Sequence, residues 1–254
     1  MIPVIGIPIV NGVHWLDRLI KSVDFPVQEL FVVNNSGNDE ISNQLQELAS
    51  QSNPNINRIR VCHLPSNIGC AGAWNLIIKS YILSPYWIIS NHDIEFSPGI
   101  LQGFYNAAAE PDVGMVHISE GDSRGSFECF LIKDWVVDKF GLFDEHFYPA
   151  YTEDVDYSMR VDGRIKKHFL TIPFLHGETT DYAVSGGNSF KTCEEPQKAI
   201  MREAYRVNNE YLARKWGPEW RKFIRYDNPF GNPNRDLSYV SYNLFENRSK
   251  FVKF

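Results

Sequence analysis

Short apolar runs alternate with amphipathic segments through the first half of the chain. The runs at 3–10 and 30–33 are apolar and end in polar loops, which predicts buried strands, and the runs at 59–64 and 86–89 predict two further strands that also end in polar loops. Helical spacing of apolar residues predicts a helix at 40–49, and further helices are expected near Ala71 and after Ser97-Pro98, a typical helix start. This alternation predicts an α/β fold with a mostly parallel central sheet flanked by helices.

The second half of the chain is less regular. We expect strands at 113–118, 127–132 and 169–175, short helices at 135–140 and 154–161, and a long amphipathic helix at 196–216. From Tyr226 onward the chain is rich in Asn, Pro, Arg and aromatic residues without clear periodicity. The pattern predicts one domain over residues 1–225, with 226–254 as a loop-rich C-terminal extension of it.

Composition narrows the class of protein. With 43% hydrophobic and 22% charged residues the chain resembles an ordinary globular protein, and its net charge of −6 disfavours a broadly basic surface for nucleic acid. The four cysteines are scattered without a CxxC pair, which favours a reducing compartment over a zinc site or a disulfide framework. No run approaches the roughly 18 apolar residues of a spanning helix, so neither a transmembrane segment nor a signal peptide is expected.

Two acidic segments are candidates for chemistry at the carboxyl ends of the strands, where ligands bind in doubly wound sheets. Asp93 directly follows a buried run and is the best candidate for a Mn²⁺ or Mg²⁺ ligand, although Asp93 and Glu95 also fit a solvated loop. Glu153, Asp154 and Asp156 begin a predicted helix. Their ordinary interpretation is a cap that stabilises the helix dipole, and the alternative is that Asp154 acts as a general base.

Three weaker signals lie elsewhere. Gly69 and Gly72 lie at a strand-to-helix turn that matches neither the dinucleotide pattern nor a phosphate loop, so nicotinamide and kinase chemistry are disfavoured. His176 ends a predicted strand, where it fits either a metal or diphosphate contact or a structural role. The segment Lys215-Trp216-Gly217 is typical of a helix C-terminal cap.

The order of these motifs resembles the GT-A-fold glycosyltransferases of the family-2 type, in particular their rhamnosyltransferase-like branch. The similar motifs, which span about residues 3–217, are Pro8-Ile9-Val10-Asn11, Asn34-Asn35-Ser36, the set Asn67, Gly69, Ala71, Gly72 and Asn75, then Asn91-His92-Asp93, the block from Gly141 to Asp156, Arg160, His176 and Lys215-Trp216-Gly217. Asn34 stands where many relatives carry Asp, and Asn91 where the metal motif often begins with Asp.

The resemblance implies an inverting, metal-assisted enzyme. Its donor would be a UDP-, dTDP- or GDP-linked sugar, and its acceptor a hydroxyl of a glycan or another molecule. Asp93 and His176 would hold Mn²⁺ or Mg²⁺, and Asp154 would be the general base. The implied nucleotide-binding residues are Pro8, Val10, Asn11, Asn34, Asn35, Ser36, Asn67, Gly69, Gly72, Asn75, Asn91 and His92.

Other functions remain open at this point. Asp93, Glu153 and Asp154 also suit the paired carboxylates of a glycoside hydrolase, and the same fold could serve as a non-catalytic nucleotide- or sugar-binding module. A nucleotidyltransferase ranks lower, because the loop after the first strand carries no Lys or Arg. We expect a soluble, cytoplasmic protein, peripheral to a membrane if its acceptor is lipid-linked.

Overall fold

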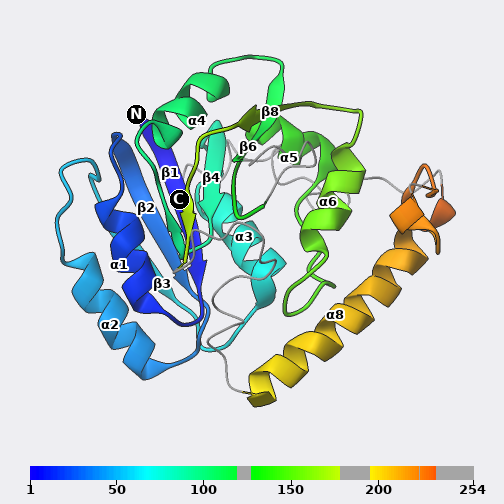
Figure 1. The fold of residues 1–254 in the computed structure, drawn as a ribbon, viewed down its shortest axis with the longest axis horizontal. Helices are drawn as coiled ribbons and strands as arrows, with labels where there is room; N and C mark the ends of the chain where they lie inside the picture. Colours follow the sequence, from blue (N-terminus) through cyan, green and yellow to red (C-terminus); the bar gives the residue numbers. More distant parts are fainter. Residues whose placement is uncertain (119–126, 178–194, 223, 233–254) are drawn as a thin grey trace.

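The computed structural model describes residues 1–118, 127–177, 195–222 and 224–232 (Figure 1). Its main sheet has seven strands in the order β3-β2-β1-β4-β7-β6-β8. These strands are β1 (Ile2–Ile9), β2 (Val27–Asn34), β3 (Ile59–His63), β4 (Tyr86–Ser90), β6 (Val113–Ile118), β7 (Cys129–Lys133) and β8 (Lys166–Leu170). The predicted α/β fold with a mostly parallel sheet is confirmed.

The strand order determines where a ligand can bind. The chain runs outward from β1 to β2 and β3 and then returns to place β4 against the other edge of β1, and all four strands are parallel. The order therefore reverses between β1 and β4, and in such sheets the ligand crevice opens beyond the carboxyl ends of those two strands. Within the described sheet β7 is the antiparallel strand, paired with β4 on one side and β6 on the other.

Helices cover both faces of the sheet (Figure 1). One face packs against α1 (Val13–Lys21), α2 (Asp39–Ala49) and α4 (Ile100–Ala108), and the other against α3 (Gly69–Ser80), α5 (Asp134–Phe140) and α6 (Glu153–Val161). The two faces are apolar because successive residues of a buried strand point to opposite sides and both sides here meet helices. This three-layer packing holds the strand ends in fixed positions.

One helix was missed and two local predictions were wrong. Helix α1 was not predicted; it begins after Gly12, which is left-handed (φ 69°) and offers no side-chain cap as a signal. Ser97-Pro98 does not start α4, because Gly99 with φ 91° is its N-cap. The expected strand at 169–175 is two strands, β8 and the short β9 (Leu175–His176), separated by a segment containing Pro173, which has no N–H for a sheet ladder.

Helix α8 (Glu195–Trp216) was predicted, but the role of its last turn was not. The Lys215 side chain is 1% exposed, and its Nζ lies 2.6 Å from Asp144 Oδ2 and 2.8 Å from Asp156 Oδ1. Asp156 also pairs with Arg160 at 2.9 Å and accepts a hydrogen bond from Trp216 Nε1 at 2.8 Å. Lys215 is therefore not simply a helix cap but the centre of a buried ionic network that attaches α8 to α6.

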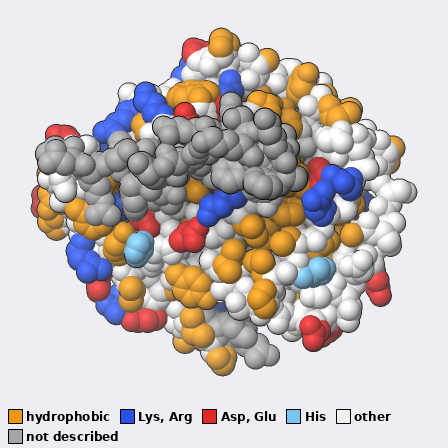
Figure 2. Space-filling view, turned by 180° about the vertical axis from the view of Figure 1, so that it is seen from behind, with side chains coloured by type: hydrophobic (Ala, Val, Ile, Leu, Met, Phe, Trp, Pro, Cys, Tyr) orange, Lys and Arg blue, Asp and Glu red, His pale blue; other side chains and the backbone are white. Residues whose placement is uncertain are grey.

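The surface adds two observations. On the face shown in Figure 2, basic and acidic side chains are interspersed among hydrophobic ones. Among the helices that the structure describes, none has the length and apolar character needed to cross a membrane. The 3-10 turn at Pro229–Gly231 belongs to the segment expected to be loop-rich, of which residues 233–254 lie outside the described part.

Candidate active site

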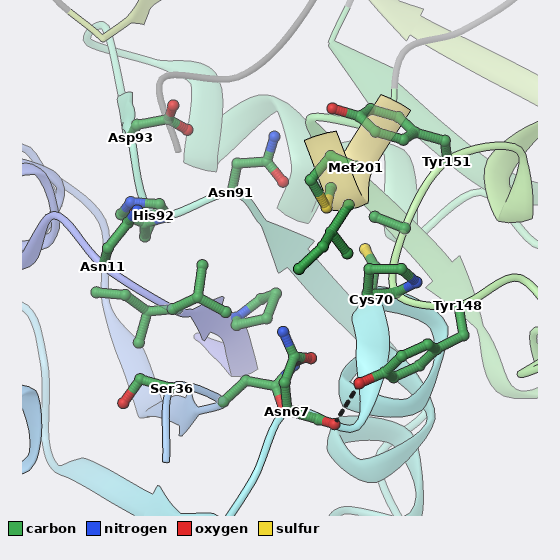
Figure 3. Close-up of a pocket in the computed structure, with 17 residues that line it drawn as sticks. Asn11, Ser36, Asn67, Cys70, Asn91, His92, Asp93, Tyr148, Tyr151 and Met201 are labelled. Atoms are coloured by element: carbon green, nitrogen blue, oxygen red, sulfur yellow. Dashed lines mark hydrogen bonds between the residues drawn. The ribbon is translucent and has the colours of Figure 1, made fainter. Parts of the chain in front are cut away.

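A pocket of about 560 Å³ lies at the predicted crevice, a size typical of small-molecule sites (Figure 3). Its walls come from the ends of β1, β2 and β4, from the start of α3, from the loop before α6 and from α8. The lining residues are Pro8, Ile9, Val10, Asn11, Asn35, Ser36, Asn67, Cys70, Asn91, His92, Asp93, Tyr148, Pro149, Ala150, Tyr151, Ile200 and Met201. Sequence motifs separated by some 80 residues therefore meet in one cavity.

The predicted residues divide into two groups. Nine of them line the pocket: Pro8, Val10, Asn11, Asn35, Ser36, Asn67, Asn91, His92 and Asp93. Asn34, Gly69, Gly72, Asn75, Asp154 and His176 are not among the lining residues. Their contacts show what each of them does in the folded chain.

Asn35 and Asn34 hold the loop after β2. Asn35 donates from Nδ2 to Asn67 Oδ1 (3.0 Å) and to the Gly69 carbonyl (3.1 Å), and its Oδ1 accepts from the Ile68 amide (2.7 Å). Asn35 thus ties this loop to the start of α3.

Asn34 is fully buried behind the wall. Its Oδ1 accepts hydrogen bonds from the Ser36 amide (3.2 Å) and hydroxyl (2.6 Å), while its Nδ2 donates to Ser42 Oγ (2.9 Å) and lies 3.0 Å from His63 Nδ1. The residue orients Ser36 toward the pocket. A carboxylate at this position would lack the donor that Ser42 uses.

The glycine turn after β3 is shaped by close packing. Gly69 has φ 83°, and a Cβ on it would lie 3.0 Å from the Tyr148 ring and 3.2 Å from the Pro149 carbonyl oxygen. At Gly72 a Cβ would meet Ile68 at 3.3 Å. Asn75 is buried in α3, where its amide exchanges two hydrogen bonds of 2.9 Å with the backbone of Phe143. These three residues support the pocket wall from behind.

The predicted metal ligands Asp93 and His176 are brought together by a two-stranded sheet. The short strand β5 (Ile94–Glu95) pairs antiparallel with β9, and the Gly177 amide donates to the Asp93 carbonyl at 2.8 Å. This pairing brings His176 Nε2 within 3.2 Å of Asp93 Oδ1, although 82 positions separate the two residues. His176 Nδ1 lies 3.5 Å from Glu128 Oε1, a carboxylate that no sequence motif singled out.

The geometry of Asp93 and His176 suits a hard cation. Two ligands on adjacent positions of an octahedral ion, each about 2.1 Å from it, are about 3 Å apart, and the measured separation is 3.2 Å. Within the described residues no set of three or more His, Cys, Asp or Glu side chains could hold an ion by itself. Such an ion would therefore need further oxygen ligands, as Mg²⁺ and Mn²⁺ sites that share a substrate phosphate do.

His92 adjoins Asp93 as a neutral group. Burial lowers the pKa of its imidazole; Asp93 opposes the shift, and His14 and His176 add to it. The side chain is 4% exposed and lines the pocket beside Asp93. A neutral imidazole here can exchange hydrogen bonds with a ligand without adding charge.

The three carboxylates at the start of α6 have different surroundings. Asp156 belongs to the buried network around Lys215. Burial raises the pKa of Glu153 to about 8, and the Asp154 charge adds to the shift. Burial also raises the pKa of Asp154; hydrogen bonds from the backbone, including that of the Val155 amide (2.8 Å), oppose the shift, and the charge of Glu128 adds to it. A simple dipole cap does not account for this arrangement, because these carboxyl groups are largely buried.

Residues 4–152 match the family model described as glycosyl transferase family 2. That segment is more than half of the chain and contains most of the pocket wall. The chain belongs to glycosyl transferase family 2. The family model ends before α8, so the side of the pocket formed by this helix lies outside the matched segment.

The family-2 chain is similar to several known proteins at low sequence identity. It is 22% identical over 253 residues to a protein named galactofuranosyl glycosyltransferase from Leishmania donovani, with 73% of this chain and 58% of the relative covered. The fold is similar to that of S. aureus TarS 1-349 in complex with UDP-GlcNAc (13% identity, TM-score 0.55, 80% of this chain and 65% of that one). It is also similar to that of GalNAc-T7 with UDP, GalNAc and Mn²⁺ (12% identity, TM-score 0.57, 67% and 42%).

These structural likenesses confirm the predicted GT-A fold. The more specific placement in the rhamnosyltransferase-like branch stays a prediction. The sequence also missed several lining residues, among them Cys70, Ile200 and Met201. No signal could have identified the last two, because a residue on an amphipathic helix gives no indication of which distant loop it will face.

Proposed function

We propose that this protein transfers a sugar from a nucleoside-diphosphate donor to a hydroxyl of a glycan or another acceptor, with metal assistance and inversion at the sugar. One observation carries the proposal. In a family-2 chain, Asp93 lines the pocket at the β1/β4 switch point, and its Oδ1 lies 3.2 Å from His176 Nε2. The UDP, UDP-GlcNAc and Mn²⁺ named for the similar structures support a nucleotide-sugar donor.

The polar side of the pocket is the proposed nucleotide site. Asn11, Ser36 and Asn67 come from three different strand ends and face the same space (Figure 3). The base and ribose would bind among these side chains, and the diphosphate would extend toward Asp93 and His176. A Mn²⁺ or Mg²⁺ ion held there would neutralise charge on the departing diphosphate. His92 would contact the diphosphate as a neutral hydrogen-bonding group.

Asp154 is the proposed general base. In the reaction the acceptor hydroxyl gives its proton to the Asp154 carboxylate, its oxygen forms a bond to the anomeric carbon, and the bond from that carbon to the diphosphate oxygen breaks. A single displacement of this kind inverts the anomeric centre. Burial supports the role, because a carboxylate whose pKa is raised accepts a proton more readily.

The proposal is tested by comparing Asp154→Asn with Asp138→Asn, an exposed carboxylate on α5. Release of nucleoside diphosphate from UDP-, dTDP- and GDP-sugars is measured across a panel of hydroxyl acceptors, and nucleotide binding is measured by calorimetry. We expect Asp154→Asn to bind nucleotide normally and to lose about two to four powers of ten in transfer rate, while Asp138→Asn behaves as wild type. Wild-type turnover by Asp154→Asn would show that Asp154 is not the general base.

The same assay separates the competing functions. A glycoside hydrolase would release free sugar from an aryl glycoside with no nucleotide present. A binding module would bind a nucleotide or a sugar and release no product with any donor and acceptor. Nucleoside diphosphate release that depends on an acceptor is the result that the transferase proposal requires.

A further inference from the structure

His176 has a carboxylate beside each of its two ring nitrogens. Its Nε2 lies 3.2 Å from Asp93 Oδ1, and its Nδ1 lies 3.5 Å from Glu128 Oε1. The side chains of His176 and Asp93 are 19% and 2% exposed, whereas that of Glu128 is 39% exposed. Burial therefore does not force Glu128 against the ring, because a carboxylate with this much access to solvent could be hydrated instead.

The backbone places Glu128 beside the predicted metal ligands. The Glu128 carbonyl accepts a hydrogen bond of 2.7 Å from the Asn91 amide, at the end of the β4–β7 ladder. Asn91 precedes Asp93 by two positions. On the other side, the pairing of β5 with β9 holds His176. Glu128 and His176 are thus brought to Asp93 by two separate strand pairings, so their meeting is part of the fold.

The two carboxylates compete for the ring proton of His176. A neutral imidazole carries one such proton, so it can donate to one of them at a time. If the proton is on Nε2, it faces Asp93 and occupies the nitrogen that the proposed ion would need. If the proton is on Nδ1, it faces Glu128, and the Nε2 lone pair lies on the side of Asp93. Metal-binding histidines commonly donate the other ring proton to a carboxylate, which fixes the tautomer and the ring orientation.

Glu128 is not placed as a ligand of the ion. Among the residues that the structure describes, no three His, Cys, Asp or Glu side chains are grouped so that they could hold an ion. Glu128 therefore does not complete a three-ligand site, and it adjoins Nδ1 of His176, whereas Asp93 adjoins Nε2. Its negative charge does extend to the site, because it contributes to the raised pKa of Asp154. This position suits a residue that acts through His176.

We propose that Glu128 is a positioning residue, whose carboxylate accepts the Nδ1 proton of His176 and so keeps the Nε2 lone pair available to a metal ion beside Asp93. This inference rests on the metal assistance in the proposed function. The negative charge of Glu128 also makes the imidazole a stronger ligand. Loss of this carboxylate leaves Asp93 as the acceptor for the ring proton, and the proton then competes with the ion for Nε2.

The first test measures the affinity for Mn²⁺. The variants are Glu128→Ala, His176→Ala and their combination, with Glu47→Ala, at an exposed glutamate of α2, as the matched control. Calorimetry with UDP, dTDP and GDP finds the nucleotide that binds wild type, and Mn²⁺ is then titrated into each protein saturated with it. We expect Glu128→Ala to weaken Mn²⁺ binding about tenfold and Glu47→Ala to leave it unchanged. Glu128→Ala should have no further effect in the His176→Ala background, because its effect passes through His176.

The second test needs no metal and no nucleotide. Long-range proton–nitrogen correlation NMR at alkaline pH, where the imidazole is neutral, distinguishes the two tautomers of His176, and His176→Ala identifies its signals. We expect the fraction of the Nδ1–H tautomer to fall in Glu128→Ala and to stay unchanged in Glu47→Ala. A residue that only stabilised the fold would not change this fraction while the protein remains folded, which thermal unfolding checks.

The outcomes separate the inference from the proposed function. Weaker Mn²⁺ binding in Glu128→Ala, absent in the His176→Ala background and accompanied by the change of tautomer, supports the positioning role. Wild-type Mn²⁺ affinity or an unchanged tautomer in Glu128→Ala overturns it and leaves the transferase proposal in place. An equal loss of Mn²⁺ affinity with and without His176 also overturns it, since Glu128 would then contact the ion directly. Absence of nucleotide binding or of Mn²⁺ binding in wild type overturns the proposed function and this inference with it.

Discussion

At the scale of single residues, the site depends on polar side chains with specific and unequal tasks. Asn34 and Asn35 are adjacent, yet Asn35 lines the pocket and Asn34 supports it from behind. Glu153 and Asp154 are likewise adjacent, and both are carboxyl groups whose pKa burial raises. The residue types in a motif therefore do not reveal which of its side chains line the pocket. The role of each side chain has to be tested by a substitution that changes a single chemical property of it.

Glu153 predicts a dependence of stability on pH. Folded Glu153 has a pKa of about 8 and keeps its proton up to that pH, whereas the unfolded carboxyl loses its proton near its ordinary pKa of 4.5. Between these values the unfolded chain binds fewer protons, so Glu153 makes the free energy of unfolding fall as pH rises, by up to about 1.4 kcal/mol per pH unit. Glu153→Gln should remove this contribution.

The measurement is urea unfolding of wild type, Glu153→Gln and the exposed control Glu47→Gln between pH 5 and 8. The difference in unfolding free energy between Glu153→Gln and wild type should grow toward pH 8 in favour of the variant. The Glu47→Gln difference should stay constant. A Glu153→Gln difference that is independent of pH would show that Glu153 titrates normally in the folded protein.

The hydrogen bonds of buried Asn34 predict that two similar Asn→Asp substitutions differ in their effect on the free energy of unfolding. Asn34→Asp would place a carboxylate where the amide now donates to Ser42, and we expect a loss of about 1–3 kcal/mol in unfolding free energy. Asn38→Asp is the matched control, because Asn38 caps α2 through Oδ1, an acceptor that Asp retains. Equal stability of the two variants in urea would contradict the structural role of Asn34.

At the scale of elements, the position of α8 depends on the buried network around Lys215. Burial alone would raise the pKa of Asp144, but the Lys215 ammonium and hydrogen bonds from Lys215 and His146 outweigh it and hold the pKa well below its usual range. The Asp144 carboxylate therefore stabilises the fold above its unfolded pKa, and this contribution is lost as pH falls through the folded value. Because this ion pair is lost at low pH, we expect α8 to separate from α6 in strong acid.

Lys215→Met should destabilise the protein by about 3–5 kcal/mol, because it leaves the Asp144 and Asp156 carboxylates buried without their shared cation. Lys222→Met, at an exposed lysine paired with Glu219, should change stability by less than about 0.5 kcal/mol. Chemical denaturation of both variants at pH 7 measures the difference. Similar midpoints for the two would show that the network does not hold α8.

Much of the fold could be predicted from the sequence because buried parallel strands leave a direct pattern, as in 86–89, where every residue is apolar and a polar loop follows. The same pattern located Asp93, Asn11 and Asn67. Contacts between distant segments could not be predicted. The meeting of Asp93 with His176 depends on a two-residue strand, and the role of Lys215 depends on where α8 packs, neither of which leaves a local signal.

At the scale of the whole molecule, one cavity combines a segment matched by the family model with a helix outside it. Residues 4–152 supply most of the pocket lining, including Tyr148 and Tyr151, and α8 adds Ile200 and Met201. The proposed donor site lies within the first segment. The chain spans 58% of the length of its Leishmania donovani relative.

The most direct test of the central claim is a calorimetric titration of UDP, dTDP and GDP, each with and without Mn²⁺. It is carried out on wild type, on Asp93→Asn and on the control Asp138→Asn. We predict that one nucleotide binds wild type and Asp138→Asn more tightly when Mn²⁺ is present, and that Asp93→Asn loses this dependence on the ion. Absence of binding by every nucleotide, or an unchanged dependence on Mn²⁺ in Asp93→Asn, would contradict it.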